Sequence, residues 1–155
     1  MRPLLVCLVA LVALPAAAQQ VRAADVVTWR VRADRAAPGA SARLVLDAQI
    51  ADGWRLYAMG SPVGIPLTLT LDPLPEGLAA GRSGQSATRT GYDPGFESDY
   101  PYFAGTARVV QQVRVAAGAR AGAREVSGSV RYAVCNDEVC LPPAQTAFRV
   151  PLVVR

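Results

Sequence analysis

The chain has 155 residues, a length typical of a single domain, with 16 basic and 12 acidic residues and no histidine. Every basic residue is an arginine, and the arginines are scattered, so we expect no nucleic-acid or membrane-surface binding face. The lack of histidine excludes Ser-His-Asp catalysis, Cys-His catalysis and His-ligated metal sites. Cys135 and Cys140, with the neighbouring Asp137 and Glu138, are too few ligands for structural zinc, so we expect neither a metal nor another cofactor.

Residues 1–18 have the features of a secretory signal peptide. A positive charge near the start precedes an apolar stretch at 4–14, and three alanines at 16–18 allow cleavage before Gln19. A second cleavage site follows Ala24. The stretch is too short to span a bilayer comfortably, which disfavours the alternative of an N-terminal anchor. We therefore expect export to an oxidising compartment, where disulfides persist.

The remaining chain has the alternating pattern of β-strands. Residues 43–50 and 107–115 place apolar side chains at every second position, with Gln111 as the exception, as in strands with one buried face. Glycine and proline mark turns between the segments, and no segment repeats every 3.6 residues. The predicted strands are 26–31, 43–50, 54–57, 67–71, 107–115, 126–134 and 148–154. This pattern predicts an all-β sandwich or barrel.

Residues 72–104 differ from the rest, because they are rich in proline and glycine and show no alternation. We expect a long loop here, and long loops in compact domains are usually functional or disordered. Aromatic residues gather in its second half, at Tyr92, Phe96, Tyr100, Tyr102 and Phe103. They predict a loop that folds back on the sheet, a lid or partner-binding surface, or both.

Cys135 and Cys140 are separated by four residues near the end of a predicted strand. They can form a disulfide if the chain turns back between them. A ring this small stabilises a fold by only about 2 kcal/mol in the chain-entropy model. Small disulfides in surface loops are also among the more easily reduced ones. The spacing therefore leaves two roles open, a redox couple or a structural bond that closes a hairpin.

The pair differs from a thioredoxin motif, because the spacing is four rather than two and no helix is expected to begin at Cys135. Asp137 and Glu138 disfavour a thiolate by like charge, and the nearest basic residue in the sequence is Arg131. These features favour a relay. A donor thiolate would attack the oxidised pair, and the reduced pair would pass its electrons on, each time through a mixed disulfide.

Four segments carry a resemblance to a known family. They are Asp-Gly-Trp-Arg-Leu-Tyr at 52–57, Gly-Ile-Pro at 64–66, Leu-Pro-Glu-Gly at 74–77 and, above all, Tyr-Ala-Val-Cys-Asn-Asp-Glu-Val-Cys-Leu-Pro-Pro at 132–143. In this order they resemble the N-terminal periplasmic domain of the thiol:disulfide interchange protein DsbD. The resemblance implies that residues 19–155 form a periplasmic, immunoglobulin-like β-sandwich. We expect about seven or eight antiparallel strands and a long cap-like loop.

The resemblance implies a thiol-disulfide oxidoreductase component whose redox-active pair is Cys135 and Cys140. The family carries reducing equivalents to thioredoxin-like proteins, such as disulfide isomerases and cytochrome c maturation factors. Its electrons come from a thioredoxin-like domain that a membrane domain supplies. The printed chain ends at Arg155, so a membrane electron-transfer protein would act in trans or belong to a longer form. The alternative function is a non-catalytic envelope binding module with a structural hairpin disulfide.

The resemblance also assigns supporting residues. Tyr57 matches an aromatic residue that lies near the pair. The segment from Asp93 to Phe96 matches the family's cap loop, with Phe96 as the ring that covers the pair. Arg55 stands where an aromatic residue often occurs. Ordinary packing is the other explanation for Tyr57 and Phe96, because most buried aromatic residues serve packing.

Overall fold

The computed structural model describes residues 20–155, so the expected signal peptide at 1–18 lies outside the described residues. Within this range no helix is long and apolar enough to cross a membrane. One short helix, α1 (Ala23–Val26), precedes the strands. The strands are β1 (Val27–Ala33), β2 (Ser41–Ile50), β3 (Arg55–Tyr57), β4 (Thr68–Leu71), β5 (Leu78–Gln85), β6 (Arg89–Asp93), β7 (Ser98–Phe103), β8 (Thr106–Val115), β9 (Gly122–Tyr132), β10 (Val134–Cys135) and β11 (Ala144–Val154).

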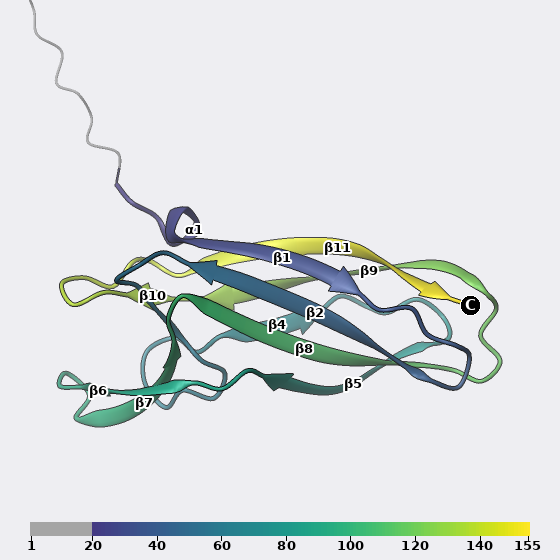
Figure 1. The fold of residues 1–155 in the computed structure, drawn as a ribbon, viewed down its shortest axis with the longest axis horizontal. Coiled ribbons are helices and arrows are strands. Elements are labelled where there is room, and N and C mark those ends of the chain that lie inside the picture. The colour runs from purple at the N-terminus through teal and green to yellow at the C-terminus, as the bar shows by residue number, and fades with distance from the viewer. Residues whose placement is uncertain (1–19) are drawn as a thin grey trace, which may run out of the picture.

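Two antiparallel sheets form a sandwich (Figure 1). One has the order β1-β2-β8-β5 and the other the order β11-β9-β4. Alternate residues of β2 and β8 point into the core, where Leu44, Leu46 and Val109 are fully buried. Leu152 of β11 is buried in the same core. The alternation predicted for residues 43–50 and 107–115 is therefore confirmed.

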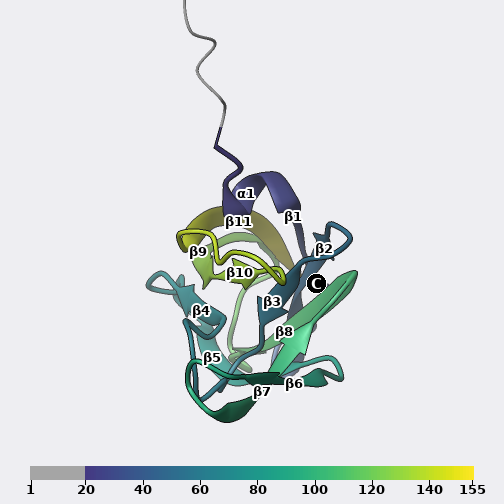
Figure 2. The same cartoon turned by 90° about the vertical axis from the view of Figure 1, so that its left-hand side faces the viewer.

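A third sheet, with the order β10-β3-β7-β6, lies at one end of the sandwich (Figure 2). It is built from the short strands β3 and β10 and from the hairpin of β6 and β7. The structure has more strands than the seven or eight expected, because β6, β7 and β10 of the third sheet and β5 of the first sheet add to them. It also provides the surroundings of Cys135, the last residue of β10.

The prediction of a long loop at residues 72–104 is wrong, because β5, β6 and β7 lie within it. β5 pairs with β8 and completes the first sheet as an edge strand. Its residues are exposed or half-buried on both faces, so the sequence lacks the apolar alternation of a strand. β6 was missed because none of its side chains is buried, and β7 because its buried side chains are the aromatic residues Tyr100 and Phe103 rather than aliphatic ones.

The single strand predicted at residues 126–134 is interrupted at Ala133. β9 pairs with β11 and β4 in the sandwich, whereas β10 pairs with β3 in the third sheet. The carbonyl of Ala133 accepts a hydrogen bond from the N–H of Tyr57, at 3.3 Å. This change of sheet carries Cys135 out of the sandwich and toward β3.

Candidate active site

A disulfide joins Cys135 and Cys140, with an S–S distance of 2.02 Å and a Cα–Cα distance of 4.0 Å. The two residues have different surroundings. Cys135 is 8% exposed, while Cys140 is an exposed residue. A partner protein approaching from solvent therefore meets Cys140 first.

The hairpin between the cysteines has its own hydrogen bonds. The N–H of Asn136 donates to the carbonyl of Val139 at 2.9 Å, and the N–H of Leu141 donates to the carbonyl of Val134 at 3.0 Å. The side-chain oxygen of Asn136 accepts from the N–H groups of Glu138 and Val139, at 2.9 and 2.7 Å. Such an Asx turn is a common way to close a tight loop. The turn is thus held by bonds other than the disulfide.

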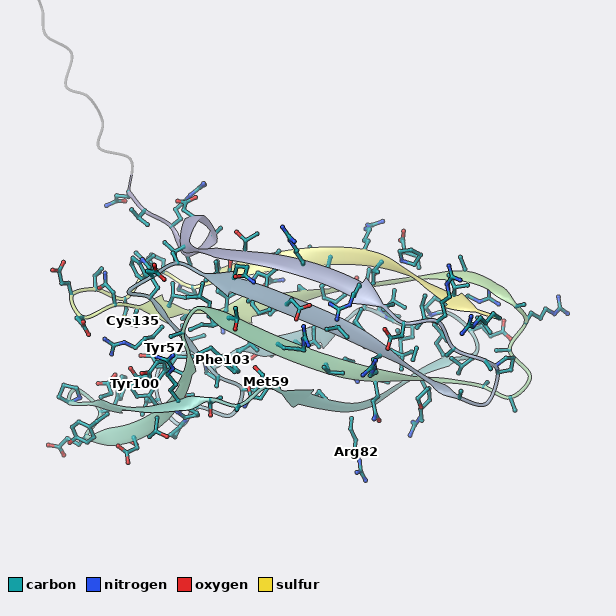
Figure 3. The ribbon with its side chains drawn as sticks, in the orientation of Figure 1. Tyr57, Met59, Arg82, Tyr100, Phe103 and Cys135 are labelled. Carbon is teal, nitrogen blue, oxygen red and sulfur yellow. A yellow bond between two sulfur atoms is a disulfide. The ribbon has the colours of Figure 1, made fainter. Side chains whose placement is uncertain are left out.

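Tyr57 is the side chain that contacts the buried sulfur. Its hydroxyl oxygen lies 3.5 Å from Sγ of Cys135. A disulfide sulfur carries no hydrogen, so the hydroxyl is the donor. Burial, and then the negative charge of Asp93, raises the pKa of Tyr57 above its ordinary value. The hydroxyl therefore stays protonated at neutral pH. Figure 3 shows Tyr57 between Cys135 and Tyr100.

A row of tyrosines continues from Tyr57 across the third sheet. The ring centroids of Tyr57 and Tyr100 are 5.1 Å apart, and those of Tyr100 and Tyr102 are 5.7 Å apart. The guanidinium carbon of Arg55 lies 5.9 Å from the centroid of Tyr102. Arg55 also forms an ion pair with Asp137 in the disulfide hairpin. The row thus connects β7 and β3 to the hairpin.

The sequence did not predict that Arg55 lies beside the cysteine pair. Arg131 is the basic residue nearest to the pair along the chain, but Arg55 lies directly opposite Cys135 in the pairing of β3 with β10. Its ion pair compensates the charge of Asp137. Asp137 therefore disfavours a thiolate at the cysteines less than expected from its place in the sequence between them. The two residues are 82 positions apart, and the sequence gives no signal of their contact.

The loop after β3 packs against Tyr57 from another side. Gly64 has φ of +67°, and a Cβ atom there would lie 2.6 Å from the ring carbon that bears the Tyr57 hydroxyl. Val63 is buried beside it. Tyr57, Val63, Tyr100 and Cys135 belong to a small cluster separate from the main core. A glycine at position 64 therefore lets the loop close on the tyrosine.

Asp93 and Phe96 lie at the turn between β6 and β7. The carboxylate of Asp93 accepts hydrogen bonds from the N–H groups of Gly95 and Phe96, at 2.9 and 3.3 Å, and so shapes the turn. The side chain of Phe96 is 61% exposed. The ring that touches Cys135 belongs to Tyr57, and the covering role of Phe96 stays a prediction.

Acidic and cysteine side chains do not converge into a metal site within residues 20–155. What the geometry offers is a disulfide with one accessible and one shielded sulfur. The shielded sulfur has a neutral hydrogen-bond donor beside it. Such a donor can stabilise negative charge that develops on sulfur when the bond is cleaved.

The fold is similar to three solved structures. The N-terminal domain of DsbD from Neisseria meningitidis in the reduced form matches with a TM-score of 0.51 and 20% identity, over 72% of this chain and 82% of that chain. A complex of the DsbD and PilB N-terminal domains from Neisseria meningitidis gives 0.51 and 17%, over 86% and 88%. The N-terminal periplasmic domain of ScsB from Proteus mirabilis gives 0.55 and 13%, over 83% and 46%. These matches confirm the immunoglobulin-like sandwich.

Sequence comparison identifies the family. No curated protein sequence matches the chain. The family model described as thiol:disulfide interchange protein DsbD, N-terminal, matches residues 23–152. This range contains all eleven strands of the described structure except the last two residues of β11. The chain therefore belongs to the family of DsbD N-terminal domains.

Proposed function

We propose that this protein is a periplasmic thiol-disulfide exchange module that relays reducing equivalents between thioredoxin-like proteins through Cys135 and Cys140. One observation carries the proposal. Cys140 is an exposed residue and offers a point of attack, and Sγ of the buried Cys135 has the Tyr57 hydroxyl 3.5 Å away. A bond that served only to close a hairpin would need neither feature.

The reducing half of the cycle follows from this asymmetry. A donor thiolate attacks Sγ of Cys140, a new S–S bond forms, and the bond to Cys135 breaks. Cys135 leaves as a thiolate and takes up a proton. The donor's second thiolate then attacks the donor sulfur of the mixed disulfide and releases Cys140. The donor is oxidised to a disulfide, and the pair gains two electrons and two protons. The reverse sequence reduces an acceptor.

Tyr57 assists the departure of Cys135. The leaving sulfur is buried, and burial disfavours a thiolate unless a donor compensates its charge. The Tyr57 hydroxyl is in place before reaction, and burial raises the pKa of Tyr57, which keeps it a donor. Hydrogen bonds to charged groups contribute about 1.5–3 kcal/mol. Tyr57 is therefore a catalytic residue in this proposal.

The disulfide is expected to add little to the stability of the fold. A ring that closes over five positions constrains the unfolded chain weakly, by about 2 kcal/mol. The hydrogen bonds of Asn136 also hold the hairpin, and none of them involves the sulfur atoms. Both arguments support a pair that cycles without disturbing the sandwich.

The relatives agree with this role. The family bears the name of a thiol:disulfide interchange protein, one similar structure is of a reduced form, and another is of a complex with the N-terminal domain of PilB. We infer that the partners here are thioredoxin-like donors and acceptors of the disulfide isomerase or cytochrome c maturation pathways. A membrane electron-transfer protein would supply the donor.

Export to the periplasm is part of the proposal, and the structure supports the earlier of two cleavage sites. Ala23 is 1% exposed in the main core, and Arg22 is bonded to Asp25. Cleavage after Ala24 would remove both the buried Ala23 and Arg22, the partner of Asp25. Cleavage near Ala18 keeps both.

The cap is also proposed on the basis of the family. The hairpin of β6 and β7 projects from the same end of the molecule as the disulfide hairpin (Figure 1). Phe96 lies between the paired residues Asp93 and Ser98 at its turn. A hairpin that bends toward the disulfide would bring this ring over Cys140 and limit attack by small thiols.

The order of attack can be tested with the two single-cysteine variants, Cys135→Ser and Cys140→Ser. Each remaining thiol is converted to a mixed disulfide with thionitrobenzoate. The rate of attack by a thioredoxin-fold reductant is then measured from the release of the coloured thionitrobenzoate anion. We expect at least about tenfold faster attack at Cys140, because Cys135 is 8% exposed. Equal rates, or faster attack at Cys135, would contradict the mechanism.

Tyr57→Phe keeps the ring and removes the donor. Reduction of the pair by dithiothreitol should slow about tenfold, the loss expected for one hydrogen bond to a charged group. Tyr102→Phe removes a hydroxyl from the same tyrosine row and serves as the matched control. The role of Tyr57 is wrong if its variant reacts at the native rate, or if both variants slow equally.

Phe96→Ala tests the cap, and Tyr92→Ala is its control, because both rings are 61% exposed and belong to the same hairpin segment. If Phe96 closes over the disulfide, its removal should speed reduction by glutathione about threefold or more, since access limits such exchange. Tyr92→Ala should leave the rate unchanged. A native rate in Phe96→Ala would count against the cap.

A further inference from the structure

A groove of about 790 Å³ opens directly beside Cys140. One wall is formed by the chain that follows the disulfide hairpin. The other is formed by the N-terminal segment at residues 20–24 and by Trp54, which precedes β3. Its apolar lining consists mainly of Val21, Trp54, Val139, Leu141, Pro142 and Pro143. Any polypeptide joined to Cys140 through a mixed disulfide would be held at this groove.

Exposed apolar side chains gather at the same end of the molecule. Among residues 20–155, the large apolar side chains that are exposed are Val21, Tyr92, Phe96 and Val139. Val21 and Val139 line the groove. Tyr92 and Phe96 belong to the hairpin that projects from this end (Figure 1). Grouped exposed apolar residues with a polar rim are typical of an interaction surface.

The two hairpins at this end carry exposed acidic residues. Glu97 and Asp99 lie on the β6–β7 hairpin, and Glu138 lies on the disulfide hairpin, all of them exposed. Arg22, which lines the groove, is paired with Asp25, and Arg55, which lies opposite Cys135, is paired with Asp137.

Arginines gather instead toward the opposite end, where β1 ends, β9 begins and β11 ends. They are Arg35, Arg114, Arg120, Arg124 and Arg155. Oppositely charged ends orient a molecule during encounter and raise the rate of productive collisions. The end that carries Cys140 thus favours a positively charged partner surface.

We propose that the groove binds the partner segment adjoining the attacking cysteine, and that this segment has apolar side chains flanked by basic residues. The proposal rests on the relay function, because the mixed disulfide with Cys140 is what brings the segment to the groove. Pro142 and Pro143 have no N–H to donate, so this wall recognises side chains rather than adding a strand.

Single-cysteine peptides test the proposal on the oxidised protein. The reference peptide is Gln-Ser-Cys-Ser-Gln; two others replace both glutamines by arginine or by glutamate, and a fourth replaces both serines by leucine. Each peptide thiolate attacks Cys140, and Cys135 leaves as a thiolate. The initial rate of mixed-disulfide formation is read by mass spectrometry. It is divided by the rate of the same peptide with a small neutral disulfide, which removes differences in thiol reactivity.

The arginine peptide should react about tenfold faster than the glutamate peptide at low salt. The advantage should fall to about twofold or less near 0.5 M salt, where charges are screened within a few ångströms. The leucine peptide should react about fivefold faster than the reference peptide, from burial of its side chains in the groove.

Two matched variants locate the charge effect. Glu97→Gln combined with Glu138→Gln should reduce the arginine-to-glutamate ratio about threefold. Glu76→Gln combined with Glu125→Gln changes the net charge equally but away from the disulfide, and should leave the ratio unchanged. Val139→Thr, which keeps the side-chain shape, should reduce the leucine advantage. Equal losses in both double variants would overturn the assignment to this end.

The outcomes separate this proposal from the function on which it rests. If the reference peptide reacts and both ratios are close to one, the groove does not select its partner and the relay stands. If neither the reference peptide nor dithiothreitol opens the disulfide, the relay fails and the groove proposal falls with it.

Discussion

The change of sheet at Ala133 determines where the cysteine pair lies in the candidate active site. Val134 and Cys135 are neighbours in a strand, so their side chains point to opposite sides. Val134 is fully buried in the main core, which anchors β10, and this leaves Cys135 facing the separate cluster around Tyr57. If β9 continued straight past Ala133, Cys135 would remain in the sandwich sheet, away from β3. The surroundings of the cysteine pair thus depend on one strand leaving its sheet at a fixed residue.

Pairing of β10 with β3 then sets the surroundings of the two sulfurs. Arg55 lies opposite Cys135 and holds Asp137 of the hairpin, while Tyr57 reaches the buried sulfur. Groups carried by paired strands are positioned more firmly than groups on loops. The hairpin beyond them is closed by Asn136 and leaves Cys140 exposed. In the proposed relay, the rigid side of the pair would stabilise a leaving thiolate, and the open side would meet a partner beside the apolar groove.

The sequence predicted the sandwich and the cysteine pair for clear physical reasons. Strands β2 and β8 are buried on one face, which imposes alternation, and the spacing of Cys135 and Cys140 allows one tight turn. It did not predict β5, which is exposed or half-buried on both faces, or the separation of β10 from β9, because β10 has only two residues and is too short to show a period. The contact of Tyr57 with Cys135 joins residues 78 positions apart and was available only through the family resemblance.

The most direct test of the relay is the reduction potential of the Cys135–Cys140 pair. The oxidised protein would be equilibrated with a thioredoxin-like protein of known potential, and its free thiols would be trapped and counted. A relay should have a value of roughly −270 to −180 mV, between thioredoxin and protein disulfide isomerase. A value below about −300 mV, in the range of structural disulfides, would contradict the relay and favour a binding module whose disulfide only closes the hairpin.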